Sequence, residues 1–228
     1  MASPKKSRKK PATQKKCTIL LVDDHPLFRR GLADLLNREL DMIVLAQANT
    51  GAEALVAIRG ALFGLVIMDI GLGNGRDGLE TTKALRAEQP DLQILFVSVR
   101  DEALYAGRAL RAGARGYVMK RESDENILGG IRAVIAGEIY VSAWMQKRLI
   151  QNHIHGSSEQ GPAIDLLTDR ELEVFHLIGH GQAVREIATN LKLSCKTIEA
   201  HREHIKEKLD FRTSRELTYF AVQRQQGD

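Results

Sequence analysis

Apolar residues in the first 137 positions follow two alternating patterns. Short, nearly continuous apolar runs predict strands at 17–22, 42–48, 65–70, 92–98 and 115–120. Between and after them, apolar residues recur every three or four positions, which predicts helices at 26–40, 50–60, 78–88, 102–111 and 123–136. Strands that are apolar throughout are buried on both faces, as in a parallel sheet covered by helices. Residues 17–137 are therefore predicted to form an α/β doubly wound domain with a five-stranded parallel sheet.

The pattern changes after residue 137. Residues 138–163 contain a short amphipathic stretch, IYVSAWMQKRLI, followed by polar sequence with Gly, Ser and Pro, which predicts a linker. Beyond it the periodicity is helical only, with helices expected at 169–179, 184–191, 195–209 and 213–224. Thr168 and Ser194 are suitable N-caps for two of these helices. Residues 164–228 are therefore predicted to form a small all-α domain.

The charge is unevenly distributed along the 228 residues, and this changes the picture at the N-terminus. The formal net charge is +4, but residues 1–16 carry seven Lys/Arg and no acid. These residues are predicted to be a disordered, solvated basic tail, and a non-specific attraction to nucleic acid is the secondary interpretation. No apolar run approaches the roughly 20 residues of a membrane helix, so no membrane partner is expected. The only cysteines, Cys17 and Cys195, are far apart, which favours a reducing, cytoplasmic location.

Polar residues cluster where the predicted strands end, which is where doubly wound sheets bind ligands. Asp23 and Asp24 follow the first strand, Asp69 ends the third, Ser98 the fourth and Lys120 the fifth. Three carboxylates at one sheet edge repel one another unless a cation lies among them, and such oxygen ligands suit Mg²⁺. A lysine and a hydroxyl suit a phosphoryl group, and a carboxylate can itself form an aspartyl-phosphate.

These segments resemble the receiver domain of two-component response regulators. LLVDDHPLFRRGL (20–32) is similar to its first-strand acidic pair and helix, and VIMDI (66–70) to its phospho-acceptor strand. FVSV (96–99) and GARGYVMK (113–120) are similar to the segments with its switch hydroxyl, switch aromatic and lysine. The resemblance covers residues 17–137 and implies the flavodoxin-like receiver fold.

The resemblance implies that Asp69 is the phospho-acceptor and that a sensor histidine kinase is the donor. The resemblance also implies roles for the other matched positions. Asp23 and Asp24 bind Mg²⁺ together with Asp69, and Lys120 and Ser98 contact the phosphoryl group. Tyr117 is implied to move as Ser98 moves. His25 either lines this site or begins the next helix.

The loop after Asp69 departs from the receiver pattern. The family usually has a proline four residues on and a glycine eight residues on. Here Gly73 replaces the proline, and the matching glycine is Gly78, one residue late. Extra glycines add freedom to a loop that should be preorganised for the metal. Metal affinity and phosphorylation rate are therefore less well defined than the identity of the acceptor.

The segment 167–209, which begins LTDRELEVFHLIGHG, resembles the helix-turn-helix domain of LuxR-type regulators. Together with the receiver, this is the architecture of the NarL/FixJ group. On the helix after Ser194, Ile198, Ile205 and Leu209 share one face, which is expected to be core. The rest of that helix and the one before it carry the predicted DNA contacts: Glu199, Ala200, Glu203 and His204 toward base edges, and Arg185, Lys196, Thr197, Arg202 and Lys206 toward phosphates.

Both domains together predict a phosphorylation-switched transcription factor rather than an enzyme. Its expected partners are the kinase, double-stranded DNA and a second copy on activation, with RNA polymerase a further partner left open. One alternative is a phosphatase with Asp69 as nucleophile, but this would need an acid where Gly71 stands. The other is a phosphorylation-independent receiver that acts only as a dimerisation module of a DNA-binding protein, which the altered loop after Asp69 keeps open.

Overall fold

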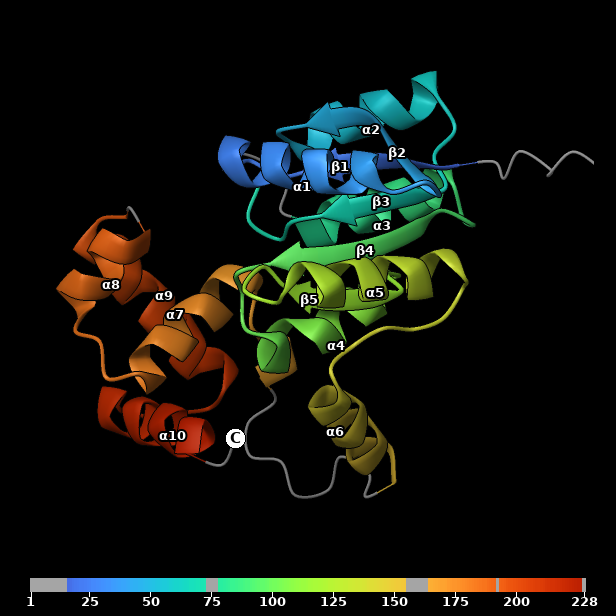
Figure 1. Cartoon of the computed structure of the whole chain (residues 1–228). Coiled ribbons are helices and arrows are strands. Elements are labelled where there is room, and N and C mark those ends of the chain that lie inside the picture. Colours follow the sequence, from blue (N-terminus) through green and yellow to red (C-terminus); the bar gives the residue numbers. More distant parts are fainter. Residues whose placement is uncertain (1–15, 73–77, 155–163, 192, 227–228) are drawn as a thin grey trace, which may run out of the picture. The chain divides into compact units, whose positions relative to one another are not determined.

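A computed structural model of the chain describes residues 16–72, 78–154, 164–191 and 193–226. The predicted basic tail therefore lies outside the described residues, except for Lys16. The chain divides into two compact units, Met1–Gln151 and Asn152–Asp228. In Figure 1 the colours run from blue to yellow in the first unit and from orange to red in the second.

The first unit is a five-stranded parallel sheet in the order β2-β1-β3-β4-β5, which confirms the predicted doubly wound fold. The strands are β1 Cys17–Val22, β2 Met42–Ala48, β3 Leu65–Met68, β4 Gln93–Ser98 and β5 Gly116–Met119. The helices are α1 Pro26–Arg38, α2 Gly51–Gly60, α3 Gly78–Glu88, α4 Glu102–Ala112 and α5 Asp124–Ile135. Each differs from its predicted range by at most two residues at either end.

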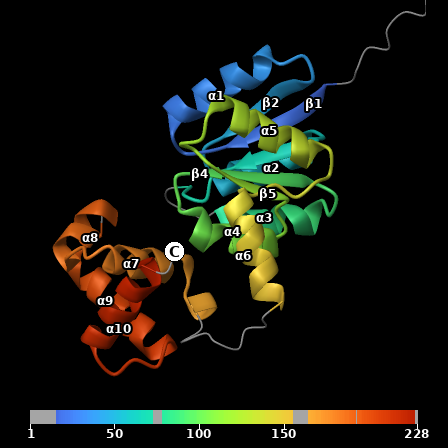
Figure 2. The ribbon, with the colours of Figure 1, turned by 60° about the horizontal axis from the view of Figure 1, so that its bottom comes forward.

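Helices cover both faces of the sheet (Figures 1 and 2). On one face, Ile19 and Ile67 of the strands pack with Leu36 of α1 and Ile131 of α5 in one buried cluster. The other face is covered by α2, α3 and α4. Because every residue of β3 and β5 is buried, these strands show no alternation of apolar and polar residues.

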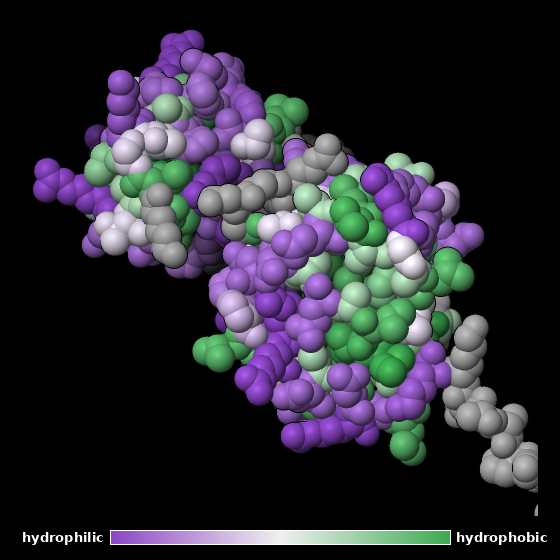
Figure 3. All heavy atoms as spheres, turned by 90° about the horizontal axis from the view of Figure 1, so that it is seen from above, coloured by the Kyte–Doolittle hydropathy of each residue, from purple (hydrophilic) through white to green (hydrophobic). Residues whose placement is uncertain are grey.

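The edge strand β2 presents apolar side chains to solvent. Ile43 and Leu45 are exposed, as is Val56 on α2, and Figure 3 shows hydrophobic side chains gathered on this unit as seen from above. The pairing of β2 with β1 is interrupted by a register shift beside Leu45, and Asn37 accepts a hydrogen bond from the backbone N–H of Val44. An interrupted edge with a capped N–H is a poorer template for pairing with another strand.

The segment predicted as a linker contains a further helix, α6 Ala143–Ile154. Ser142 precedes it, and its Oγ accepts a hydrogen bond of 3.1 Å from the backbone N–H of Met145. Val141 and Met145 are both buried, which anchors the start of the helix. The amphipathic stretch therefore forms about three turns of helix rather than a short turn.

The second unit is all-helical, as predicted. It comprises a 3₁₀ turn at Ile164–Leu166 and helices α7 Asp169–Gly179, α8 Val184–Leu191, α9 Cys195–Lys208 and α10 Ser214–Gln226. Thr168 caps α7, and Ser194 caps α9 through a hydrogen bond from the backbone N–H of Thr197. No helix among the described residues is both long and apolar enough to cross a membrane.

Candidate phosphorylation site and DNA-binding helices

The first unit places its acidic residues where strands end. Asp23 follows the last residue of β1, and Asp69 follows the last residue of β3. Backbone hydrogen bonds continue the sheet here, from the N–H of Asp23 to Ala48 O at 3.1 Å and from that of Asp69 to Val22 O at 2.8 Å. Both side chains are buried, so their charge must be balanced within the protein.

Lys120 provides that balance from the end of β5. Its Nζ lies 2.6 Å from Asp69 Oδ2 and 2.7 Å from Asp23 Oδ2, and its side chain is only 6% exposed. Ser98, at the end of β4, donates a hydrogen bond of 2.6 Å to Asp69 Oδ1. Both oxygens of Asp69 are therefore engaged by the two residues predicted to contact its phosphoryl group. Phe28 of α1 lies beneath the ammonium group, with 4.5 Å from Nζ to the ring centroid.

His25 has both of the placements that the sequence left open. It occupies the N-cap position of α1, although its side chain makes no capping hydrogen bond. Its Nδ1 lies 2.8 Å from Asp24 Oδ1, 3.2 Å from Asp23 Oδ1 and 3.7 Å from Asp69 Oδ2. The imidazole therefore lies at the mouth of the acidic cluster.

The acidic cluster fits a divalent cation. One ligand atom from each of Asp23, Asp24, His25 and Asp69 lies within 4.8 Å of the others, and no other such group occurs among the residues that the structure describes. Asp24 Oδ1 is shielded from solvent and accepts no hydrogen bond of regular geometry. His25 Nδ1 lies 2.8 Å from this oxygen. Three carboxylates at a partly open site are the ligands that Mg²⁺ takes, with water completing its shell.

Tyr117 is buried in β5 and is connected to Ser98 through Arg100. Its hydroxyl donates a hydrogen bond of 2.8 Å to the carbonyl of Arg100, and Ser98 Oγ accepts one of 3.3 Å from the N–H of Arg100. Burial raises the pKa of the Tyr117 hydroxyl well above its ordinary value, so this donor stays protonated. Ser98 and Tyr117, which were predicted to move together, thus both form a hydrogen bond with the backbone of Arg100.

Gly78, which stands one residue later than the glycine of the receiver pattern, lies directly against Asp69. Gly78 is the first residue of α3, and its N–H donates to Ile70 O at 2.9 Å. A Cβ at this position would lie 2.1 Å from the carbonyl oxygen of Asp69, so only glycine fits without displacement of the backbone. Residues 73–77, where the loop departs most from the receiver-family pattern, lie outside the described part of the chain.

The second unit confirms the predicted buried face of α9. Ile198 and Ile205 are fully buried, whereas the positions predicted to face bases are exposed: Glu199, Ala200, Glu203 and His204. Of the predicted phosphate contacts, Lys196 and Arg185 of α8 are exposed, and Thr197 is half-buried.

The remaining two predicted phosphate contacts are paired along α9. Arg202 Nη1 lies 3.3 Å from Glu199 Oε1, and Lys206 Nζ lies 2.7 Å from Glu203 Oε2. The side chains of Arg202 and Lys206 are only 17% and 15% exposed. Each must leave its glutamate before it can reach a phosphate. The i, i+3 spacing of the opposite charges on the predicted helix was a sequence signal for both pairs, because residues three positions apart are neighbours on a helix surface.

Glu171 connects α7 to α9 beneath this helix. It completes a capping box with Thr168, and its Oε2 lies 2.6 Å from Lys208 Nζ. Burial opposes ionisation of Glu171, but hydrogen bonds from Lys208 and Thr168 outweigh it, so its pKa lies below the ordinary value. Lys208 carried no distinguishing signal in the sequence, because a lysine in the last turn of a helix is common.

A doubly wound domain with Asp, Lys and Ser gathered at its strand ends, joined to a helix-turn-helix unit, defines a two-component response regulator of the DNA-binding class. Residues 19–132 match the response regulator receiver domain, and residues 165–221 match the luxR family of bacterial regulatory proteins. The chain therefore belongs to the response regulators that carry a luxR-type DNA-binding domain, and it is a transcription regulator.

Proteins of known sequence or structure agree with this assignment. Oxygen regulatory protein NreC of Staphylococcus haemolyticus is 35% identical over 210 residues, which cover 90% of this chain and 97% of NreC. A LuxR-family response regulator from Aurantimonas sp. SI85-9A1 is 30% identical, with a TM-score of 0.57 over 61% of this chain and 99% of that one. RcsB from Salmonella enterica serovar Typhimurium, bound to promoter rprA, shares the fold at 20% identity, with a TM-score of 0.58 over 91% of this chain and 99% of RcsB.

Proposed function

We propose that Asp69 accepts a phosphoryl group from a sensor histidine kinase, and that this modification controls the binding of DNA by α9 and the N-terminal end of α8. The observation that carries the proposal is the placement of a buried carboxylate between Lys120 and Ser98. A phosphoryl group needs a cation and a hydroxyl donor for its oxygens, and Lys120 and Ser98 supply one of each.

The transfer is a displacement at phosphorus. One Asp69 oxygen forms the new P–O bond as the P–N bond to the kinase histidine breaks, and the histidine nitrogen retains the electron pair and takes up a proton. For attack to occur, Ser98 or Lys120 gives up its bond to that oxygen and turns to the phosphoryl oxygens. Mg²⁺, held by Asp23, Asp24 and Asp69, supplies positive charge beside those oxygens when it is bound.

Further parts of the proposal concern partners and place. A second copy on activation would let two α9 helices read two half-sites one helical turn apart, which is the usual arrangement of helix-turn-helix dimers. The cytoplasm is the proposed location, because the DNA lies there and the two described cysteines are free. Contact with RNA polymerase stays a proposal without a structural feature assigned to it.

The alternatives are less well supported. A phosphatase would need a general acid two residues after Asp69, and Gly71 has no side chain to supply it. A phosphorylation-independent dimerisation module would not need Lys120 and Ser98 on the two oxygens of Asp69. The similarity to NreC along nearly the whole chain also favours the regulator.

The test is incubation of the full chain with Mg²⁺ and acetyl phosphate, followed by measurement of its intact mass. We expect one phosphoryl group on the wild type and none on Asp69→Asn. Asp91→Asn, which changes an exposed carboxylate outside the site, is the control and should be modified like the wild type. An Asp69→Asn protein that still gains a phosphoryl group would refute the assignment, and an unmodified wild type would favour the dimerisation module.

A further inference from the structure

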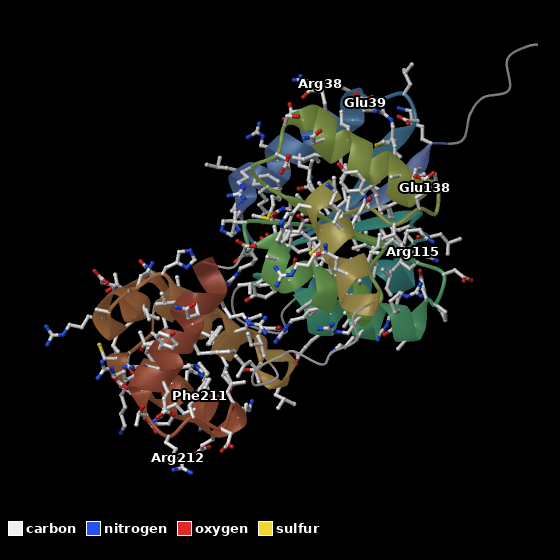
Figure 4. All side chains as sticks on the ribbon, turned by 90° about the horizontal axis from the view of Figure 1, so that it is seen from below. Arg38, Glu39, Arg115, Glu138, Phe211 and Arg212 are labelled. Carbon is white, nitrogen blue, oxygen red and sulfur yellow. The ribbon has the colours of Figure 1, made fainter. Side chains whose placement is uncertain are left out.

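The chain returns along the edge of the sheet after α5. In this return segment, residues 138–142, the N–H of Tyr140 donates to Arg115 O at 3.0 Å, and its carbonyl accepts from Tyr117 N at 2.8 Å. Figure 4 labels Arg115, just before β5, and Glu138, at the start of the segment. The segment therefore extends the sheet beyond β5 by one parallel bridge.

Two glycines make room for Tyr140. A Cβ on Gly116 of β5 would lie 2.6 Å from the carbonyl oxygen of Tyr140, and one on Gly130 of α5 would lie 2.9 Å from its ring. The next residue, Val141, is buried. The return segment is thus seated in the receiver fold, and it does not leave the domain directly after α5.

The end of the return segment is held by the first turn of α4. Glu102 Oε1 accepts a hydrogen bond of 2.8 Å from the backbone N–H of Ser142. Ser142 is also the residue whose Oγ accepts from the N–H of Met145 at the start of α6. One side chain of α4 therefore holds the peptide at which α6 begins.

The same turn of α4 adjoins the residues that contact Asp69. Arg100, two residues before Glu102, receives the Tyr117 hydroxyl on its carbonyl and donates its N–H to Ser98 Oγ. Tyr117 in turn donates its backbone N–H to Tyr140. Two short routes thus connect Ser98 with the return segment, one through Arg100 to Glu102 and one through Tyr117.

We propose that Glu102 is a positioning residue that couples the state of Asp69 to α6, the helix that leads toward the DNA-binding unit. This inference rests on the proposed phosphorylation of Asp69. When Ser98 turns from Asp69 Oδ1 to a phosphoryl oxygen, it displaces Arg100 and the first turn of α4. The Glu102–Ser142 hydrogen bond then breaks, and the start of α6 is released.

Hydrogen–deuterium exchange of the full chain tests the coupling. In the wild type, we expect phosphorylation to speed exchange of the amides at 141–147 by about fivefold, the effect of losing one hydrogen bond of ordinary strength. Glu102→Ala should show this faster exchange without phosphorylation and gain little more with it. Glu102→Gln keeps an acceptor oxygen and should stay close to the wild type.

A matched control separates this contact from the general effect of an acid at a helix N-terminus. Glu125→Ala removes a first-turn acid from α5 and should leave exchange at 141–147 unchanged. The intact mass is recorded for each variant, and Glu102→Ala should accept a phosphoryl group like the wild type. Wild-type exchange in unphosphorylated Glu102→Ala overturns the proposal.

A second perturbation keeps the test independent of the proposed function. Ser98→Ala removes the hydrogen bonds to Asp69 and from Arg100 without any phosphorylation. It should speed exchange at 141–147 in the wild-type background and have no further effect in Glu102→Ala. If the wild type takes no phosphoryl group, the proposed function fails, whereas the coupling also fails if Ser98→Ala leaves this exchange unchanged.

Discussion

The carboxylate of Asp69 shows how a single side chain depends on its neighbours. It is 2% exposed, yet Ser98 and Lys120 occupy its two oxygens at 2.6 Å each. A buried ion pair contributes little net stability, because desolvation of the charges offsets their attraction. These contacts are therefore better explained by a function for Asp69 than by a need for stability.

Gly78 is the residue whose substitution should most directly disturb Asp69 from the backbone. In Gly78→Ala, the new Cβ would lie 2.1 Å from Asp69 O, so β3 or α3 must move. We expect a loss of about 2–4 kcal/mol in the free energy of unfolding and slower phosphorylation.

Gly129→Ala is the control, because a Cβ added at Gly129, in the middle of α5, would meet nothing within 4 Å. It should stabilise the protein by about 0.5–1 kcal/mol, as Ala does in a helix. Urea unfolding followed by Trp144 fluorescence measures both, and an equal effect of the two substitutions would contradict the steric argument.

Tyr117 should make the first unit sensitive to alkaline pH. Its pKa is raised above 10.0 in the folded protein, so the folded state keeps a proton that the unfolded state loses. Its contribution to stability is complete below pH 10 and declines above it, by about 1.4 kcal/mol per pH unit.

Tyr117→Phe should remove this alkaline loss. It should also cost about 1 kcal/mol at pH 7, because the carbonyl of Arg100 loses its donor. Urea unfolding between pH 8 and pH 11 is the measurement. Tyr219→Phe, which removes a hydroxyl from a 68% exposed residue, is the control. Parallel pH curves for wild type and Tyr117→Phe would be inconsistent with the buried tyrosine as the cause.

At the scale of elements, the position of α9 depends on α7. The ends of both helices meet at Glu171, which caps α7 and binds Lys208 in the last turn of α9. A cation there also interacts favourably with the C-terminal end of the α9 dipole. Glu171 Oε1 also lies 4.0 Å from Nδ1 of His204, which belongs to the exposed face of α9, so this buried charge orients that face from its edge.

Glu171→Gln should loosen α7 against α9. The amide keeps an acceptor for the Thr168 N–H but loses the charge that binds Lys208, which we expect to cost about 1 kcal/mol. Because the folded pKa of Glu171 is lowered, this contribution is present above its ordinary pKa of 4.5 and is lost as the pH falls through the folded value. Hydrogen exchange of α7 and α9 amides in the variant and the wild type should differ at pH 7 and converge as the pH falls progressively below 4.5. Glu207→Gln, an exposed change on α9, should behave as wild type at both pH values.

At the scale of the whole molecule, the distribution of charge sets how DNA binding depends on salt. The segment 162–228 carries ten bases and eleven acids, and four of its bases are paired with acids in the described residues, as Arg170–Glu173, Arg202–Glu199, Lys206–Glu203 and Lys208–Glu171. Bulk charge in that segment therefore attracts DNA weakly. The seven bases of residues 1–16 are the largest excess of positive charge in the chain.

Deletion of residues 1–15, which leaves Lys16 on the carbonyl of Glu39, should weaken DNA binding without regard to sequence. The slope of log K against log salt should become shallower by about 0.9 for each phosphate contact that is lost. Fluorescence anisotropy at several salt concentrations, on a specific and a random duplex, measures this. A variant with the six bases Lys5, Lys6, Arg8, Lys9, Lys10 and Lys15 changed to Gln should match the deletion, and identical salt slopes in all three proteins would contradict the prediction.

Sequence pattern alone determined the five strands, the helices that alternate with them and the sheet edge at which Asp23, Asp69, Ser98 and Lys120 meet. This was possible because burial imposes a short-range period on the chain and because the carboxyl ends of parallel strands lie at one edge. The buried face of α9 followed from the same kind of period.

Only the tertiary structure decided which atoms meet. That Lys120 bridges Asp23 and Asp69, that Glu102 holds Ser142, and that α6 forms in a segment of linker-like sequence depend on residues 40 or more positions apart or on burial of Val141 and Met145. A local pattern reports whether a side chain is buried. It does not report its partner, because hydrogen bonds and ion pairs form over a few ångströms between positions that only folding brings together.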